Sequence, residues 1–259
     1  MFENIDLNRI IWSIGSYGLP QPYYKMEIPS VKAIIDSEVN DPEYEEFVRK
    51  MGIEQVEKIM KAAGEKGTVM HTFIENFLLK YNECKNISDA LIHTQDESLR
   101  ILNKDKISED KIEQGRNLFY KFYYSNYPNV FKDLIKIEMG VYSNKLFYRG
   151  KLDIFYKDRI FGLAITDFKS SSAKIKKGTI KELKYKLQIG GYALAVDEMY
   201  ESKGIEVNTG SILCMTKDHD KPQDINCSGK ELKKYKEEFK TLVINYHIKN
   251  KDKYSLKKQ

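Results

Sequence analysis

Two aspartates and a lysine lie on neighbouring predicted strands, where their side chains can act together. Asp153 lies on a predicted strand at 146–155, Asp167 lies near the end of the next strand at 160–168, and Lys169 follows. The hairpin turn falls midway between the two aspartates, so antiparallel pairing brings their carboxylates together at one end of the sheet. Converging carboxylates repel each other unless a cation lies between them, and their oxygens suit Mg²⁺ or Mn²⁺. A lysine beside that cation can orient or deprotonate a water and neutralise charge on a phosphate, which is the chemistry of phosphodiester hydrolysis.

The tripeptide Asp-x-Lys carries little information by itself in this chain. Seven Asp/Glu-x-Lys tripeptides occur, and only Asp167–Lys169 ends an apolar strand that follows another aspartate-bearing strand. An ordinary solvated hairpin is the alternative interpretation of this pair. The context, rather than the tripeptide, favours a catalytic role.

Two predicted helices carry further polar pairs at a spacing of four residues, which places each pair on one helix flank. His71 and Glu75 form the first pair, and an imidazole there can add a nitrogen ligand that favours Mn²⁺ over Mg²⁺. Gln188 and Tyr192 form the second, and both can hydrogen-bond a phosphate or an active-site carboxylate. The alternatives are a boundary histidine at the rim of the core and an ordinary hydrogen bond on a helix surface.

Taken in order, these residues resemble the PD-(D/E)XK nuclease superfamily, and within it the RecB-like branch. The residues that carry the resemblance are Gly67, His71, Glu75, Glu138, Gly150, Asp153, Asp167, Lys169, Gln188 and Tyr192. The run at 148–153 is similar to the second-strand signature of the family. The run at 28–31 resembles the entry segment of nucleases similar to the mitochondrial genome-maintenance exonuclease and its phage relatives.

The resemblance implies a role for each matching position. The metal ligands would be His71, Asp153, Asp167 and the main-chain carbonyl of Phe168. Lys169 would be the catalytic lysine, with Gln188 and Tyr192 supporting the site and the substrate backbone. Glu75 is also a candidate catalytic residue, although the roles at the positions of Glu75 and Glu138 vary within the family. The cofactor would be Mg²⁺ or Mn²⁺.

We expect an α/β (α+β) fold with a restriction-endonuclease-like core, a central mixed sheet of about four to five strands flanked by helices, and N-terminal helical additions. Strands are predicted at 135–141, 146–155, 160–168 and 211–216, and helices at 41–60, 65–81, 112–127, 182–200 and 230–248. The connection at 82–110 is predicted to hold only short helix, and the helix at 112–127 to be stopped by Pro128. The inward positions of the first helix would be Phe47, Met51, Val56 and Met60. The aromatic run at 118–127 suits a core, or else stacking on bases.

These elements form one expected nuclease domain over residues 1–259. It comprises a mainly helical part at 1–130, which carries the His71/Glu75 helix, a catalytic core at 131–216 and a basic C-terminal helix at 217–259.

The charge distribution favours a polyanionic partner. The net charge is +5, yet residues 168–186 hold seven lysines against one acid, and residues 230–259 hold ten lysines against four acids. Two basic segments on an otherwise acidic chain suit nucleic acid, and DNA is the expected partner. The alternative is the general lysine richness of the composition. The candidate nucleic-acid-binding residues are Lys174, Lys176, Lys177, Lys184 and Arg149.

Several classes of protein are disfavoured. Cys84, Cys214 and Cys227 are too few and too far apart for a disulfide framework or for the four-cysteine iron–sulfur cluster of many RecB-like nucleases. No apolar run approaches the roughly 20 residues of a membrane span, and no signal peptide is visible, so we expect a cytoplasmic protein, in the host cytoplasm if a phage encodes it. No phosphate-binding motif of a motor enzyme is present.

The leading hypothesis is a divalent-metal-dependent DNA nuclease, an exonuclease on single-stranded or frayed ends that serves replication, recombination or repair, in a phage for instance. Two alternatives remain open: a structure-selective or RNA endonuclease of the same fold, and a catalytically silent nucleic-acid-binding protein.

Overall fold

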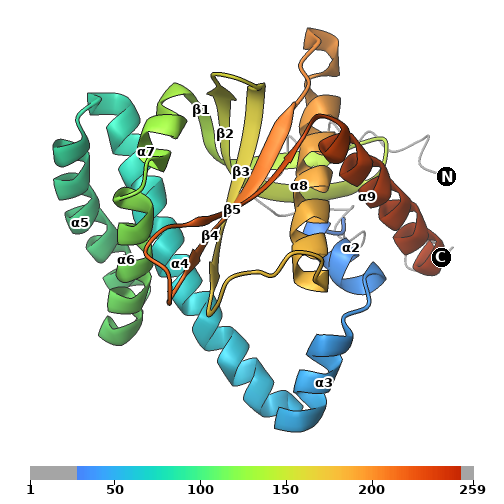
Figure 1. Cartoon of the computed structure of the whole chain (residues 1–259), viewed down its shortest axis with the longest axis horizontal. Coiled ribbons are helices and arrows are strands. Elements are labelled where there is room, and N and C mark those ends of the chain that lie inside the picture. Colours follow the sequence, from blue (N-terminus) through green and yellow to red (C-terminus); the bar gives the residue numbers. More distant parts are fainter. Residues whose placement is uncertain (1–27, 252–259) are drawn as a thin grey trace, which may run out of the picture.

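A mixed sheet lies between two groups of helices in the computed structural model, which describes residues 28–251 (Figure 1). The strands are β1 (Leu134–Ser143), β2 (Tyr148–Asp158), β3 (Gly162–Ser171), β4 (Thr209–Thr216) and β5 (Gln223–Ser228). Their order in the sheet is the same as in the chain. Only β3 and β4 run parallel, and the other three neighbouring pairs are antiparallel. The five strands confirm the predicted mixed sheet and its three consecutive antiparallel strands.

The helices cover both faces of this sheet. One group consists of α4 (Ile53–Cys84), α5 (Ile87–Lys104), α6 (Glu109–Tyr123) and α7 (Tyr127–Val130). The other consists of α2 (Val31–Glu38), α8 (Ile180–Met199) and α9 (Gly229–Lys249). Helix α3 (Pro42–Met51) joins α2 to α4, and two short 3₁₀ turns, η2 (Phe131–Asp133) and η3 (Glu201–Lys203), complete the described chain. Each group of helices has its own apolar core against the sheet.

Helix α4 is the element that brings a histidine to the sheet. Its apolar stripe is fully buried against α6 and the strands, through Phe73, Ile74 and Phe77 among others. Gly115 of α6 permits a close approach, because a Cβ there would lie 2.4 Å from the Val69 Cβ and 2.8 Å from the Lys66 carbonyl oxygen of α4. The predicted amphipathic helix at 65–81 is therefore confirmed, within a longer helix.

Three predictions about the helical part are wrong in detail. The helix predicted at 41–60 is broken at Gly52, which has a φ of 80° that favours glycine. Three of its four expected inward residues are exposed, by 37% (Phe47), 46% (Met51) and 56% (Met60), and Val56 alone is buried. Phe47 and Met51 belong to α3, which has no buried residue. The connection at 82–110 holds the 18-residue helix α5.

Pro128 lies in the first turn of a helix rather than at the end of one. Helix α6 ends at Tyr123, and Pro128 occupies the first turn of α7, where its missing N–H leaves no intrahelical bond unmade. The aromatic side chains of this region belong mostly to the core, since Phe119 and Phe122 are fully buried. Tyr124 is an exception, with 78% of its surface exposed.

Candidate active site

Asp153 and Asp167 meet where the ladder between β2 and β3 ends. The last paired residues are Ile154 and Thr166, so each aspartate lies one step beyond the ladder. There the Asp153 carboxylate accepts the Phe168 backbone N–H at 2.5 Å, in place of a carbonyl of the neighbouring strand. Asp153 and Asp167 are only 8% and 2% exposed. The predicted convergence of the two carboxylates is confirmed by this geometry.

A third acidic residue, Glu138, joins them from β1. The flanking pairs Ile137–Ile154 and Met139–Leu152 place Glu138 across from Asp153. Glu138 has a φ of 51°, a left-handed conformation that is unfavourable for a side chain with a Cβ and that recurs at functional sites. Its carboxylate also forms an ion pair with Lys151 of β2.

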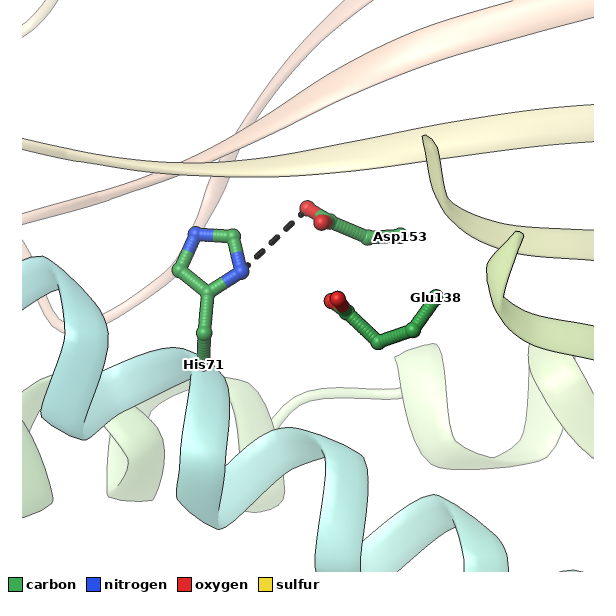
Figure 2. Close-up of side chains that lie close together, drawn as sticks. All are labelled: His71, Glu138 and Asp153. Atoms are coloured by element: carbon green, nitrogen blue, oxygen red, sulfur yellow. Dashed lines mark ion pairs between the residues drawn. The ribbon is translucent and has the colours of Figure 1, made fainter. Parts of the chain in front are cut away.

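His71 reaches the same carboxylates from α4. Its Nδ1 lies 3.4 Å from the Asp153 Oδ2, and the side chains of His71, Glu138 and Asp153 point toward one another (Figure 2). One ligand atom from each residue lies within 4.8 Å of the other two. One turn earlier in α4, Gly67 fits against β3, since a Cβ there would lie 3.4 Å from the Ser170 Oγ.

Asp167 is held by a different set of partners. Lys169 forms an ion pair with Asp167, and its side chain is 27% exposed. From α8, the Gln188 side-chain amide donates to the Asp167 Oδ1 at 3.4 Å and to the Tyr192 hydroxyl at 2.8 Å. The structure thus brings all the predicted catalytic residues of β2, β3 and α8 to one place.

Gly150 allows the Tyr192 ring to lie against β2. A Cβ at this position would lie 2.6 Å from the Tyr192 Cε1 and 3.2 Å from a methyl carbon of Val31, both closer than packed side chains tolerate. The glycine of the second-strand run is therefore a steric requirement for the contact between Tyr192 and the sheet.

The two aspartates respond differently to their surroundings. Burial raises the pKa of Asp153, but His71, Lys169 and the Phe168 N–H outweigh burial and hold the pKa below its ordinary value. Burial, reinforced by the Asp153 charge, raises the pKa of Asp167 to about 6 despite its contact with Lys169. Ionisation of Asp167 is therefore unfavourable in the protein without a bound cation, and a nearby cation would favour the ionised form.

The basic side chains are held in their charged forms by these carboxylates. Burial lowers the pKa of Lys169, but Asp167 and Asp153 outweigh it and raise the pKa above its ordinary value. Burial likewise lowers the pKa of His71, and the Asp153 carboxylate reverses the direction. Lys169 is therefore protonated and paired with Asp167, and in this form it cannot act as a base.

Glu75 lies at the margin of the centre. Burial raises its pKa, Lys151 opposes that shift, and Asp153 adds to it. Glu75 is thus within electrostatic reach of the cluster, although it is not among the three residues whose ligand atoms converge.

The converging donor set fits a divalent cation. One imidazole nitrogen and two carboxylate oxygens, from His71, Glu138 and Asp153, suit Mn²⁺ or Mg²⁺. Asp167 lies beside this set and is engaged by Lys169 and Gln188 instead. Metal ligation by Asp167 and by the Phe168 carbonyl remains a prediction. Glu138 belongs to the converging set, although the resemblance implied no definite role for it. The left-handed backbone that positions Glu138 has no signature in the residues around it.

The candidate nucleic-acid-binding residues fall into two groups. Lys174, Lys176 and Lys177 are exposed in the loop between β3 and α8. This loop is fixed by the Gln223 amide of β5, which donates to the Ile175 carbonyl and accepts the Ile175 N–H, both at 2.8 Å. The loop lysines therefore have a defined position beside the catalytic strand.

Lys184 and Arg149 make contacts within the chain. Lys184 of α8 forms ion pairs with Asp41 at 3.0 Å and with Asp36 at 3.8 Å. The Arg149 guanidinium donates to the Ile28 carbonyl at 3.2 Å. Both side chains fasten the segment around α2 to the core, so a role in binding DNA would compete with these contacts.

The sequence profile of the PD-(D/E)XK nuclease superfamily matches residues 43–254. The chain belongs to this superfamily. PD-(D/E)XK nucleases typically use divalent metal ions, and His71, Glu138 and Asp153 form the candidate metal site of this member. Membership makes the protein a nuclease by family, with nucleic acid as its substrate.

The other comparisons add little to the superfamily assignment. A crystal structure of a "Putative exonuclease" from Eubacterium rectale is similar, with 13% sequence identity and a TM-score of 0.43, over 71% of this chain and 68% of the other. No curated protein matches the sequence significantly. Within residues 28–251, no helix has the length and apolar character needed to cross a membrane.

Proposed function

We propose that this PD-(D/E)XK protein is a divalent-metal-dependent DNA nuclease, and that it acts as an exonuclease on single-stranded or frayed DNA ends. The observation that carries the proposal is the meeting of Asp153, Asp167 and Lys169 at the end of the β2–β3 ladder, beside His71 and Glu138. Such a cluster suits hydrolysis of a phosphodiester, because it combines a cation site with a fixed positive charge.

Each residue has a distinct part in the proposed reaction. His71, Glu138 and Asp153 would hold Mg²⁺ or Mn²⁺, and the bound cation would supply Lewis-acid activation of the phosphodiester and of a water. The Lys169 ammonium would stabilise charge that develops on the phosphate, since its neighbours keep it protonated. Gln188 would keep Asp167 in place through its hydrogen bond, and Tyr192 would hold Gln188.

The preference for DNA ends is supported by the resemblance to the genome-maintenance and phage nucleases in the residues at 28–31. The exposed, anchored lysines of the β3–α8 loop support binding of a polyanion beside the catalytic strand. A place in replication, recombination or repair, in a phage or in the cytoplasm of its host, agrees with this activity.

The test compares linear and circular substrates. The purified full chain is incubated with 5′- and 3′-labelled linear single-stranded DNA, circular single-stranded DNA, duplex DNA and RNA, each with Mg²⁺, Mn²⁺ or EDTA. We expect linear strands to be degraded with metal while circles survive, and the label that is released first will give the polarity.

Other outcomes would replace the proposal. Cleavage of circles at a rate similar to that of linear strands would make the protein an endonuclease, and degradation of RNA alone would change the substrate. Metal-independent binding of DNA without cleavage of any substrate would leave a binding protein on a nuclease fold.

A further inference from the structure

Three lysines converge from three separate elements at the end of the sheet where the catalytic strand β3 ends. They are Lys66 of α4, Lys111 of α6 and Lys217 of the turn between β4 and β5. None of them belongs to the candidate active site described above. Backbone packing brings these three positions to the same end of the sheet.

Packing between α4 and α6 places Lys66 and Lys111 on neighbouring turns. The Lys66 carbonyl lies 2.8 Å from the position of a Cβ at Gly115, and Lys111 lies four residues before Gly115 in α6. The β4–β5 turn is tied to the same helix by Lys121, whose ammonium donates to the carbonyls of Lys217 at 2.7 Å and His219 at 2.8 Å. The Lys66 backbone thus lies against α6 about one turn from Lys111, and the Lys217 backbone is fixed against α6 by Lys121.

The positive charge of this cluster is poorly compensated. Partial burial lowers the pKa of Lys66, and the charges of Lys111 and Lys217 lower it further. In residues 28–251, Lys111 has an ion-pair partner in Asp110, at 3.6 Å, and no carboxylate pairs with Lys66 or Lys217. Keeping like charges together without a counter-charge is unfavourable, so the cluster is well suited to an anion from outside the chain.

The register of β3 and β4 links the cluster to the catalytic lysine. Lys169 pairs with Cys214 and Ser171 pairs with Thr216, so Lys217 is the next residue past the parallel ladder. This places the cluster about 10 Å beyond Lys169 along the strands, at roughly 3.3 Å per residue. Gly67, adjacent to Lys66, contacts Ser170 of the same strand end. Figure 1 shows α4 passing this end of the sheet.

We propose that Lys66, Lys111 and Lys217 form a phosphate-binding subsite that holds the nucleic acid strand a few nucleotides from the bond that is cut. This inference rests on the proposed function, since it concerns the path of the substrate to that centre. The subsite directs the nucleic acid across the end of β3 and β4 toward α6, rather than along the lysine-rich helix α9.

The test uses the double variant Lys66→Ala/Lys217→Ala in the full chain. Binding of a fluorescent 20-nucleotide single-stranded DNA is measured by anisotropy in EDTA, between 50 and 300 mM KCl, as set conditions. Each lost phosphate contact reduces the slope of log K against log salt by about 0.7 for single strands, so the slope should become shallower by about 1.4. At about 0.1 M salt the same relation gives an affinity loss of about 25-fold.

Two matched variants provide the controls. Lys230→Ala/Lys233→Ala removes the same charge from exposed positions of α9, and the affinity should fall only slightly. Lys66→Arg/Lys217→Arg keeps the charge and should restore the salt slope. Circular dichroism and a melting curve establish that each variant is folded.

Cleavage of oligonucleotides of increasing length gives a second readout. Shortening the substrate to a dinucleotide should remove the difference between the double variant and the wild type, because a dinucleotide cannot reach the subsite. An unchanged salt slope in the double variant, with normal wild-type binding, would overturn the subsite alone. An equal loss in the α9 control would also overturn it, whereas failure of the wild type to bind or cleave any strand would overturn the proposed function.

Discussion

Replacing Asp167 with asparagine separates two effects of this carboxylate. One is the unfavourable free energy of its ionisation in the folded protein without metal, and the other is its contribution to binding a cation. The substitution keeps the size of the side chain and removes its charge. Because burial and the Asp153 charge raise the pKa of Asp167 to about 6 from an ordinary 3.8, ionising this group in the folded protein is unfavourable. The difference, about two pH units at about 1.4 kcal/mol each, corresponds to at most about 3 kcal/mol.

The sign of the effect follows from the direction of the shift. A carboxyl whose pKa is raised by folding stabilises the fold while it is protonated, and that contribution is fully present below about pH 4. It is lost as the pH rises through about 6. The wild type without metal should therefore lose up to about 3 kcal/mol between pH 4 and 7, and Asp167→Asn should not. Loss of the Lys169 contact in the variant adds a penalty that is nearly independent of pH, since Lys169 stays protonated throughout.

The assay is thermal unfolding in EDTA at several pH values between 4 and 7.5. The melting temperature of the variant relative to the wild type should rise across this range by roughly 6–12 °C, at about 2–4 °C per kcal/mol for a chain of this size. Asp218→Asn, which removes an exposed carboxylate from the β4–β5 turn, should show no such trend. Saturating Mn²⁺ should then raise the melting temperature of the wild type more than that of the variant. A constant difference between variant and wild type at all pH values would refute the reasoning.

Three further substitutions test separate parts of the site. Lys169→Met should reduce cleavage by at least about 10²-fold through loss of charge stabilisation, while Mn²⁺ still raises the melting temperature; normal turnover would rule out the proposed role. Glu138→Gln should weaken Mn²⁺ binding measured by calorimetry by about tenfold or more, because one of three converging ligands loses its charge; unchanged affinity would exclude Glu138 from the site. Gly150→Ala should cost about 1–3 kcal/mol in denaturant unfolding and lower cleavage, since its Cβ would overlap the Tyr192 ring at 2.6 Å; wild-type stability would show that the ring can move freely.

The catalytic hairpin was predictable because its register follows from one turn. Asp153 and Asp167 are equidistant from the hairpin turn, and in an antiparallel pair that symmetry alone brings them together. The contacts of Gln188 and Tyr192 agree with their spacing of four residues on α8, which places both on one flank. His71 is similar, since the apolar stripe of α4 orients it toward the sheet.

Other features had no comparable signal in the residues themselves. The strand β5 is short and largely polar, with Ile225 and Cys227 as its buried residues, so its pattern resembles a loop. The position of Glu138 depends on a left-handed backbone conformation. A glycine in the sequence would indicate such a conformation, whereas a glutamate does not. The pairing of Lys184 with Asp41 joins residues far apart in the chain, and composition alone suggested a free surface lysine instead.

The central claim is that the cluster around Asp153, Asp167 and Lys169 hydrolyses nucleic acid with the help of a divalent cation. The most direct test is a time course of end-labelled single-stranded DNA with wild type and Lys169→Met, each in Mn²⁺, in Mg²⁺ and in EDTA. We expect degradation by the wild type with metal and none in EDTA, and at least about 10²-fold slower degradation by the folded variant with either metal. Cleavage that persists in EDTA, or that survives in Lys169→Met at the wild-type rate, would contradict the account.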